Sequence, residues 1–535
     1  MDLRDFYGGK HVLLTGATGF VGKVLLEKLL WEFCAPCSHY LGPKLHVLIR
    51  SQKKSAAQRL EELFDSPAFQ RLRARQSLQL RNLEYCLSVV DGDLDSECLG
   101  LSSESYDALG ACCDVALHCA ALVDWAAPLH RSLRSNALGT RRVAQLTAQK
   151  PGRLVCVSTA WVHGKAAGPC AEVPLRRSLD PEAEISRCFT YLDEVTRLST
   201  EMDFLEEARQ RLGPGPVPTA LAEMAETLRG RWVDAEMSRW GVDTARARGW
   251  WDGYTFSKAI GEMLVQDVQG VRPYAVVRPS GVVSAWAEPM PGWVDAYLLV
   301  EPLIEGMGRG QITEFPGRRD CVIDCVPVDY VCNVVLAAAG CLPAAPVAPE
   351  SCPARVYQVA SGDVSPNTLG EIESTWREYF KSQPMHNQGR PVEVRPVKFL
   401  PSADDFVSSL QRRYLTPLRR CLSVLELLPV QHMAPLRDGR AWLKRKHRSL
   451  EKLTLLARLY STYTLNEWSF QTPRTRELMA QVDSVRFPYF PEKPWTWRDF
   501  WTQKHIPGMR QWVLKESQAV SHTVQAVNQG NHARL

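Results

Sequence analysis

The sequence predicts an α/β protein built on a doubly wound parallel sheet, with a helical insertion and a mainly α-helical C-terminal domain. Three observations predict it. A glycine-rich turn near the N-terminus joins a strand-like run to a helix-like run. Five β-rich runs between residues 12 and 159 alternate with helical patterns. Beyond about residue 365, Arg-rich amphipathic segments replace the strand-like runs.

The glycine-rich turn follows the apolar run 12–15 and precedes the helical pattern 23–30. Gly16, Gly19 and Gly22 have the spacing of a nucleotide-binding turn. Gly16 permits the tight turn, Gly19 lets the backbone approach a pyrophosphate, and Gly22 lets the helix pack closely on the strand. A helix that begins there directs its backbone N–H groups at an anion. We therefore expect a dinucleotide site, the alternative being an ordinary glycine-rich βα turn.

Further strands and helices follow in alternation, the signature of a parallel sheet with helices on both faces. After the first strand we expect strands at residues 45–49, 87–90, 115–121, 154–159, 274–280 and 356–360. Helices are expected at residues 55–80, 136–148, 253–264 and 331–339. This arrangement is of the Rossmann type, in which the ligand lies at the carboxyl ends of the strands.

The predicted boundaries are residues 1–364 for the nucleotide-binding domain, 365–516 for the helical domain and 517–535 for a flexible tail. The first domain contains an insertion at about 165–250, whose two helical parts are separated by the breaker at 213–218. Because it immediately precedes the helical pattern at 253, we expect the insertion to form a lid or substrate wall. The alternative is a solvent-facing decoration.

Composition excludes several classes of protein. A net charge of +5 on 535 residues is too mild for a nucleic-acid-binding protein, although it suits an anionic substrate. The 16 Cys are scattered, which is typical of reduced thiols in an intracellular compartment. Cys34 and Cys37 have C-x-x-C spacing, but the sequence has no second Cys or His pair to complete a zinc site. We therefore expect no metal site.

No signal peptide or transmembrane segment is expected. The N-terminus lacks an apolar core, and the most apolar run, 331–347, is broken by Gly340 and two prolines. Peripheral membrane contact is compatible with the composition. The last residues, Ala533, Arg534 and Leu535, have the form of the Ser-Lys-Leu peroxisomal address. We expect a peroxisomal location if that address operates, and a cytoplasmic one if the tripeptide is a chance match.

The second predicted strand ends at Arg50, which Ser51, Lys53 and Lys54 follow. An acid at this strand end binds the ribose 2′-hydroxyl of NAD, whereas a base accommodates the 2′-phosphate of NADP. The cluster favours NADPH, the alternative being a solvated basic loop.

A second constellation comprises Tyr254, Lys258 and the hydroxyls of Ser158 and Thr159. Tyr254 and Lys258 are four residues apart, so they share one helix face. A phenol with a reference pKa of about 10 is a poor acid–base catalyst unless a nearby cation favours its phenolate. Either hydroxyl can bind a substrate carbonyl oxygen. The alternative for the Tyr–Lys pair is an exposed helix face.

These motifs resemble the extended short-chain dehydrogenases/reductases and, more narrowly, the alcohol-forming fatty acyl-CoA reductases. The resemblance rests on Gly9–Leu30, His118–Ala121, Val157–Ala160, Tyr254–Lys258, Val277–Ser280, Glu288–Asp295, Leu456–Val482 and Trp497–Leu514. It implies that Tyr254 donates the proton, that Lys258 assists it, and that Thr159, or its neighbour Ser158, binds the carbonyl. The residues it implies for cofactor binding are Thr15, Gly16, Thr18, Gly19, Phe20, Val21, Gly22, Arg50, Asp93, Leu94, Ala120, Tyr254, Lys258, Pro279 and Ser280.

The resemblance further implies that NADPH reduces a long-chain acyl-CoA to an aldehyde and then to a primary alcohol, which would feed ether lipids if the enzyme is peroxisomal. An acyl-carrier-protein thioester is an alternative substrate. The same motifs would also suit an aldehyde-forming reductase, a sterol or sugar-nucleotide dehydrogenase, or a non-catalytic NADP sensor. We expect the insertion and C-terminal helices to build the acyl groove. Coenzyme A could bind the basic residues Arg440, Lys444, Arg445, Lys446 and Arg448, unless these form a solvated helix face. The sequence predicts neither the length of the acyl chain nor the oligomeric state of the protein.

Overall fold

A computed structural model describes most of the chain. The described residues are 1–34, 42–75, 86–150, 152–166, 168–213, 215–270, 272–297, 299–343, 354–426, 434–490 and 496–516. Cys37, the tail 517–535 and its terminal tripeptide lie outside them.

The fold is centred on a seven-stranded parallel sheet, in which the strand order is β11-β7-β5-β4-β1-β2-β3. The strands are β1 (His11–Thr15), β2 (Lys44–Ile49), β3 (Leu87–Asp91), β4 (Val115–His118), β5 (Arg153–Val157), β7 (Tyr274–Pro279) and β11 (Ala354–Val359). The chain runs outward from β1 to β3 on one side and from β4 to β11 on the other, so the order reverses between β1 and β4. The predicted fold class is confirmed.

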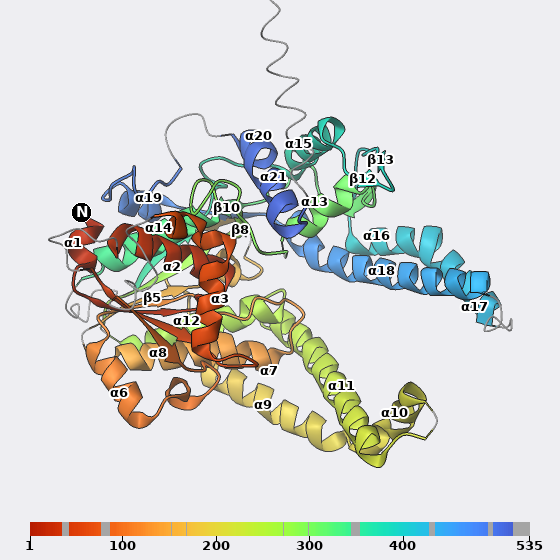
Figure 1. The fold of residues 1–535 in the computed structure, drawn as a ribbon, viewed down its shortest axis with the longest axis horizontal. Coiled ribbons are helices and arrows are strands. Elements are labelled where there is room, and N and C mark those ends of the chain that lie inside the picture. The colour runs from red at the N-terminus through yellow and green to blue at the C-terminus, as the bar shows by residue number, and fades with distance from the viewer. Residues whose placement is uncertain are drawn as a thin grey trace, which may run out of the picture.

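Alternating side chains of β1 explain why helices cover both faces of the sheet. Val12 and Leu14 pack in one hydrophobic core, whereas Leu13 packs in the other. One face is covered by α2 (Phe20–Phe33) and α14 (Val328–Cys341), and α1 (Leu3–Tyr7) and α19 (Pro473–Met479) pack on α14. The opposite face is covered by α6 (Ser103–Cys112), α8 (Gly139–Thr147) and α12 (Gly253–Gln269), as Figure 1 shows.

Two predicted helices have different bounds in the structure. The pattern at 136–148 belongs to a longer helical stretch that begins with α7 (Leu129–Ser132) and passes through a π-helical turn, Leu133–Leu138, into α8. The pattern at 55–80 is interrupted after α3 (Ala56–Asp65), and α4 (Gln70–Ala74) follows. The interruption is at Pro67, which has no backbone N–H to continue the helix.

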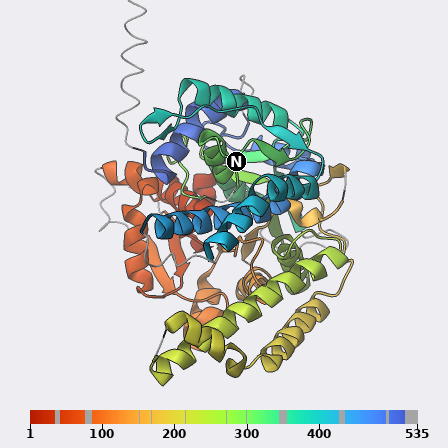
Figure 2. The same cartoon turned by 90° about the vertical axis from the view of Figure 1, so that its right-hand side faces the viewer.

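The insertion forms an arm of three helices, α9 (Pro181–Leu198), α10 (Leu205–Leu212) and α11 (Pro218–Ala247). The predicted breaker at 213–218 separates α10 from α11. Figures 1 and 2 show the distal part of the arm extending away from the sheet, while the near ends of α9 and α11 contact α7 and α12.

The segment after residue 365 is mainly helical, as expected. Its helices are α15 (Leu369–Ser382), α16 (Ala403–Leu410), α17 (Thr416–Glu426), α18 (Ala434–Leu465), α19, α20 (Trp497–Asp499) and α21 (Ile506–Gly508). The segment also contains short strands: β12 (His386–Asn387), β13 (Arg390–Pro391), β14 (Lys398–Leu400) and β15 (Trp468–Phe470). The sequence did not predict them, because two or three residues are too few to show an alternating pattern.

This C-terminal segment has a small hydrophobic cluster of its own, in which α16 packs on α18, but much of the segment is joined to the first domain. β14 pairs with β9 (Glu314–Pro316), and β15 pairs with β6 (Gly168–Cys170). Its aromatic side chains pack with α13 (Glu301–Gly308) and with the pair β8 (Gly281–Val283) and β10 (Cys325–Pro327). No helix among the described residues is long and apolar enough to span a membrane.

Candidate active site

A cavity of about 570 Å³ opens at the carboxyl ends of the central strands. All residues predicted for catalysis and for nicotinamide cofactor binding line it except Thr15, which is fully buried. The Thr15 Oγ1 lies 2.7 Å from His118 Nδ1 and accepts a hydrogen bond of 3.3 Å from the Ala120 N–H. Thr15 therefore supports the loop after β4 from below rather than forming the cavity wall.

Two glycines of the predicted turn are required by close packing. Gly16 has a φ of +79°, and a Cβ there would lie 2.5 Å from Ala120 N. A Cβ on Gly22 would lie 2.0 Å from Gly16 O, well inside van der Waals contact. Between them, Gly19 is the N-cap of α2, and its lack of a side chain keeps the helix N-terminus open toward the cavity. This geometry fits a pyrophosphate held by backbone N–H groups.

Arg50 extends from the end of β2 into the cavity wall and is 47% exposed. Its Nη1 lies 3.4 Å from Asp93 Oδ1 and 3.3 Å from Asp95 Oδ2, so two carboxylates orient the guanidinium. Arg59, which the sequence did not single out, lines the same region. Lys53 does not line the cavity. The basic end of the cavity therefore consists of two arginines rather than the predicted cluster.

Tyr254 lies in the first turn of α12 and is 9% exposed. Burial and the Asp252 carboxylate raise the pKa of Tyr254, and a hydrogen bond with the Thr159 side chain opposes that shift. The Ser158 Oγ is buried and has no hydrogen-bond partner among the described residues. Of the two candidate hydroxyls, that of Thr159 is therefore the one that is hydrogen-bonded to the Tyr254 phenol.

Lys258 is buried one helical turn after Tyr254. Its Nζ donates a 2.8 Å hydrogen bond to the Val157 carbonyl oxygen, which fixes the ammonium at the end of β5. Burial lowers the pKa of Lys258, and the nearby Cys156 and Glu262 oppose that shift. The predicted catalytic side chains therefore meet in one cavity.

Asn136 is a buried residue of this site that sequence reasoning missed. It lies in the π-helical turn, where its Oδ1 accepts a 2.7 Å hydrogen bond from Leu122 N and its Nδ2 lies 3.0 Å from Ser257 Oγ. A Cβ on Gly261 would lie 2.5 Å from Asn136 O. Asn136 therefore ties the loop after β4 to the helix that carries Tyr254.

Tyr463 is a second missed residue and comes from the C-terminal helix α18. Its hydroxyl donates a 3.1 Å hydrogen bond to Asp252 Oδ2, and its ring packs against Trp125 and Trp161 of the cavity wall. Asp252 caps α12 by accepting from Thr255 N at 2.8 Å. The C-terminal segment thus reaches the start of the helix that holds Tyr254.

A second, narrow cavity of about 80 Å³ adjoins the first, because Trp161 and Leu299 line both. Its wall is almost wholly apolar and includes Leu303, Met307, Phe315, Trp376 and Tyr460. No described residue of the insertion lines either cavity. The expectation that the insertion forms a substrate wall is therefore wrong for these two cavities, whereas the C-terminal helices contribute as expected. None of the five basic residues from Arg440 to Arg448 lines them either.

The family model described as Male sterility protein matches residues 14–335, which include the end of β1, the glycine turn, Tyr254 and Lys258. The chain belongs to the fatty acyl-CoA reductase family. A chloroplastic fatty acyl-CoA reductase 2 of Arabidopsis thaliana is 29% identical over 96% of this chain and 80% of that protein. The alcohol-forming fatty acyl-CoA reductase of Simmondsia chinensis is 27% identical over 96% and 99%. Fatty acyl-CoA reductase 2 of Homo sapiens is 26% identical over 97% and 87%.

Among solved structures, the terminal reductase domain of the myxalamid biosynthetic pathway is similar to this fatty acyl-CoA reductase homologue. Its TM-score is 0.53 at 18% identity, over 94% of this chain and 91% of that domain. At this identity the likeness shows the fold. As a member of its family, the protein is an NAD(P)-dependent oxidoreductase with an NAD(P)-binding domain.

Replacing Tyr463 with Phe tests its contact with Asp252. Because hydrogen bonds to charged groups contribute about 1.5–3 kcal/mol, we expect the free energy of unfolding in denaturant to fall by about that amount. In the wild type, the hydrogen bond from Tyr463 also lowers the pKa of Asp252. In the variant the pKa of Asp252 rises, so the limb of the pH–rate profile that follows ionisation of Asp252 beside Tyr254 should shift to higher pH. The exposed Tyr414→Phe control should change neither quantity. A variant with lower stability and an unmoved pH profile would show a structural role only.

Proposed function

We propose that this protein uses NADPH to reduce long-chain fatty acyl-CoA to the primary fatty alcohol through a fatty aldehyde. The observation that carries the proposal is the meeting of Tyr254, Thr159 and Lys258 in a cavity that continues into an apolar one. The first cavity has room for a nucleotide and a reacting carbonyl, and the adjoining apolar cavity has room for part of an alkyl chain.

The residues present fit a nicotinamide dinucleotide. The absence of a Cβ at Gly16 and Gly22 leaves the backbone of the turn open beside the helix N-terminus, and Arg50 and Arg59 provide positive charge for a 2′-phosphate. When bound, NADPH supplies the hydride. Burial of Tyr254 and Lys258 keeps water from competing for the reacting carbonyl.

In the first reduction, Tyr254 and Thr159 donate hydrogen bonds to the thioester carbonyl oxygen and stabilise the negative charge that develops there. Proton transfer from Tyr254 completes a hemithioacetal, which breaks its C–S bond to release coenzyme A and leave an aldehyde. The same hydroxyls then receive the aldehyde oxygen, and a second hydride and proton give the alcohol. Lys258 favours proton donation by Tyr254, because its ammonium group stabilises the phenolate that remains after the proton has left.

The experiment that tests this proposal supplies palmitoyl-CoA or hexadecanal with NADPH and identifies the products. We expect hexadecanol from both substrates. Release of hexadecanal from palmitoyl-CoA, with no reduction of added hexadecanal, would instead indicate an aldehyde-forming enzyme. Turnover of a sterol or sugar nucleotide but not of either lipid would overturn the proposal.

Arg50→Ala tests the preference for NADPH. A hydrogen bond between charged groups contributes about 1.5–3 kcal/mol, and Arg50 is half exposed, so we expect KM for NADPH to rise on the order of tenfold. KM for NADH, which lacks the 2′-phosphate, should remain unchanged. Lys53→Ala, which removes an exposed charge outside the cavity, is the matched control. Equal changes for both cofactors would contradict a 2′-phosphate contact.

Leu303→Trp tests the acyl site. Leu303 is partly buried on α13 and lines the apolar cavity, so the larger ring should occupy space that the end of a long chain needs. Because each buried CH₂ contributes about 0.8 kcal/mol, loss of two or three of them should lower kcat/KM for palmitoyl-CoA by about tenfold or more. Activity on decanoyl-CoA should persist. Leu303→Ala should retain the wild-type preference for long chains. A uniform loss for all chain lengths in the Trp variant would contradict this position of the chain.

A further inference from the structure

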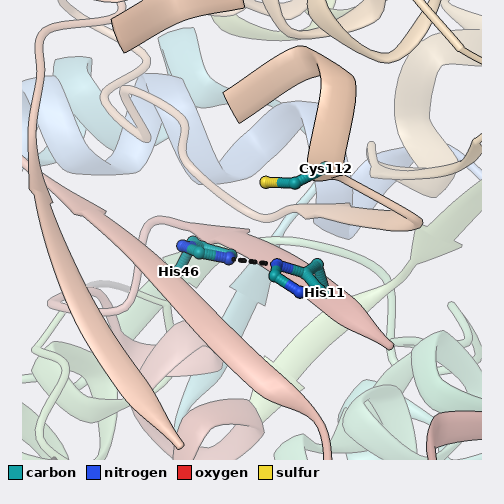
Figure 3. A group of neighbouring side chains, drawn as sticks. All are labelled: His11, His46 and Cys112. Atoms are coloured by element: carbon teal, nitrogen blue, oxygen red, sulfur yellow. Dashed lines mark hydrogen bonds between the residues drawn. The ribbon is translucent and has the colours of Figure 1, made fainter. Parts of the chain in front are cut away.

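A cluster of two histidines and a cysteine lies at the amino ends of the strands, whereas the reductase cavity lies at their carboxyl ends. His11 begins β1, His46 lies in β2, and Cys112 is the last residue of α6. The His11 Nδ1 lies 3.0 Å from the His46 Nε2, and the Cys112 Sγ lies within 4.8 Å of a ring nitrogen of each. Figure 3 shows the two rings facing each other, with the Cys112 side chain on one side of the pair.

We propose that His11, His46 and Cys112 bind a transition-metal ion, preferentially Zn²⁺, at a site separate from the reductase cavity. Two imidazole nitrogens and one sulfur are a donor set that suits Zn²⁺. At Zn–N distances of about 2.1 Å, tetrahedral geometry separates two ligand nitrogens by about 3.4 Å. The observed 3.0 Å between the ring nitrogens is therefore within a few tenths of an ångström of the required spacing. A fourth position remains for water.

A hydrogen bond orients His46 for this role. Its Nδ1 lies 2.8 Å from Ser88 Oγ on the neighbouring strand β3, and the Ser88 hydroxyl is itself directed at the Leu45 carbonyl oxygen, 3.5 Å away. In this arrangement Nδ1 carries the proton, and the lone pair of Nε2 is directed at His11. Metal-bound histidines ordinarily make such a hydrogen bond through the ring nitrogen that does not bind the ion.

Lysines and one carboxylate surround the cluster. Lys10, Lys44 and Lys150 bring positive charge, and the Asp114 carboxylate offsets part of it. One carboxylate oxygen of Asp114 lies 2.8 Å from Lys150 Nζ, and the other accepts a 2.8 Å hydrogen bond from His11 N. Asp114 therefore offsets a lysine charge and also fixes the backbone that carries a ligand.

The three ligands come from elements far apart in the sequence, which is why no spacing motif predicted them. A bound ion would connect β1, β2 and α6. Its role is therefore structural, and it acts on the stability of the fold rather than on the reduction. Metal binding to the folded state alone stabilises that state in proportion to the logarithm of the metal concentration above Kd.

The test uses the full chain after removal of metal with a chelator, with Co²⁺ and Zn²⁺ as probes. We expect one Co²⁺ per chain with a thiolate-to-cobalt charge-transfer absorption, displacement of Co²⁺ by Zn²⁺, and a rise in Tm with Zn²⁺. Cys112→Ser should abolish the absorption, and His46→Gln should weaken binding at least tenfold. Cys98→Ser and His386→Gln, which change exposed residues elsewhere, should leave both unchanged.

Retained NADPH binding shows that each variant is folded. Absence of binding at micromolar metal would overturn the proposal, as would the same stoichiometry and affinity in Cys112→Ser and His46→Gln. A loss of binding in a control variant alone would assign the metal to another site and would also overturn it.

Discussion

Tyr254→Phe should lower kcat for acyl-CoA reduction by about 10²- to 10⁴-fold, the usual contribution of a general acid. The substitution removes one oxygen from a side chain that is only 9% exposed and leaves a ring of nearly the same volume. The fold and the cofactor site should therefore persist. Thr159 would still offer a hydrogen bond to the carbonyl oxygen, but no group would deliver the proton. Single-turnover kinetics with NADPH measures the chemical step directly.

NADPH affinity, measured by fluorescence titration, is the accompanying readout for Tyr254→Phe. It should stay within about threefold of the wild type, because a hydride-donating cofactor is held mainly at the glycine turn and the ribose. The exposed Tyr414→Phe variant controls for removal of a phenol elsewhere. If Tyr254→Phe retained more than a tenth of the wild-type rate, Tyr254 would not be the proton donor.

Gly22→Ala should remove NADPH binding and destabilise the protein. The added Cβ would lie 2.0 Å from Gly16 O and 2.9 Å from the Ala17 Cα, both of which are backbone atoms that cannot rotate away. Helix α2 must therefore move away from β1, which displaces its N-terminus from the pyrophosphate position. Overpacking of this kind costs about 1–3 kcal/mol, and we expect a fall of that size in the free energy of unfolding.

Gly230→Ala in α11 is the matched control, because no atom lies within 4 Å of the position its Cβ would take. Alanine replaces glycine there in a helix interior, so stability should rise by about 0.5–1 kcal/mol and NADPH binding should not change. Wild-type NADPH affinity in Gly22→Ala would contradict the assignment of the turn as the pyrophosphate site.

The features that sequence predicts well are those that depend on neighbouring residues. The strand–turn–helix around Gly16 follows from glycines at fixed spacing, and burial on both faces gives β1, β4 and β5 their apolar runs. Tyr254 and Lys258 share one face because a helix places residues four apart together. These local rules were sufficient to predict the parallel sheet and to select catalytic residues that the structure places in one cavity.

What sequence missed depends on contacts between distant segments. Tyr463 reaches Asp252 only because α18 packs against the start of α12, and no periodicity in α18 signals that contact. The role of Thr15 depends on His118, which lies on another strand. The insertion was expected to form a wall because it precedes Tyr254 in sequence. None of its described residues lines either cavity, and the distal part of its arm extends away from the sheet (Figure 1).

The measurement that tests the proposed function most directly is the ratio of NADPH oxidised to coenzyme A released in one reaction with palmitoyl-CoA. Two successive hydride transfers per thioester predict a ratio of two throughout the time course, with hexadecanol equal to the coenzyme A released. A ratio of one, with hexadecanal accumulating in step with coenzyme A, would contradict the alcohol-forming reaction and limit the enzyme to the first reduction.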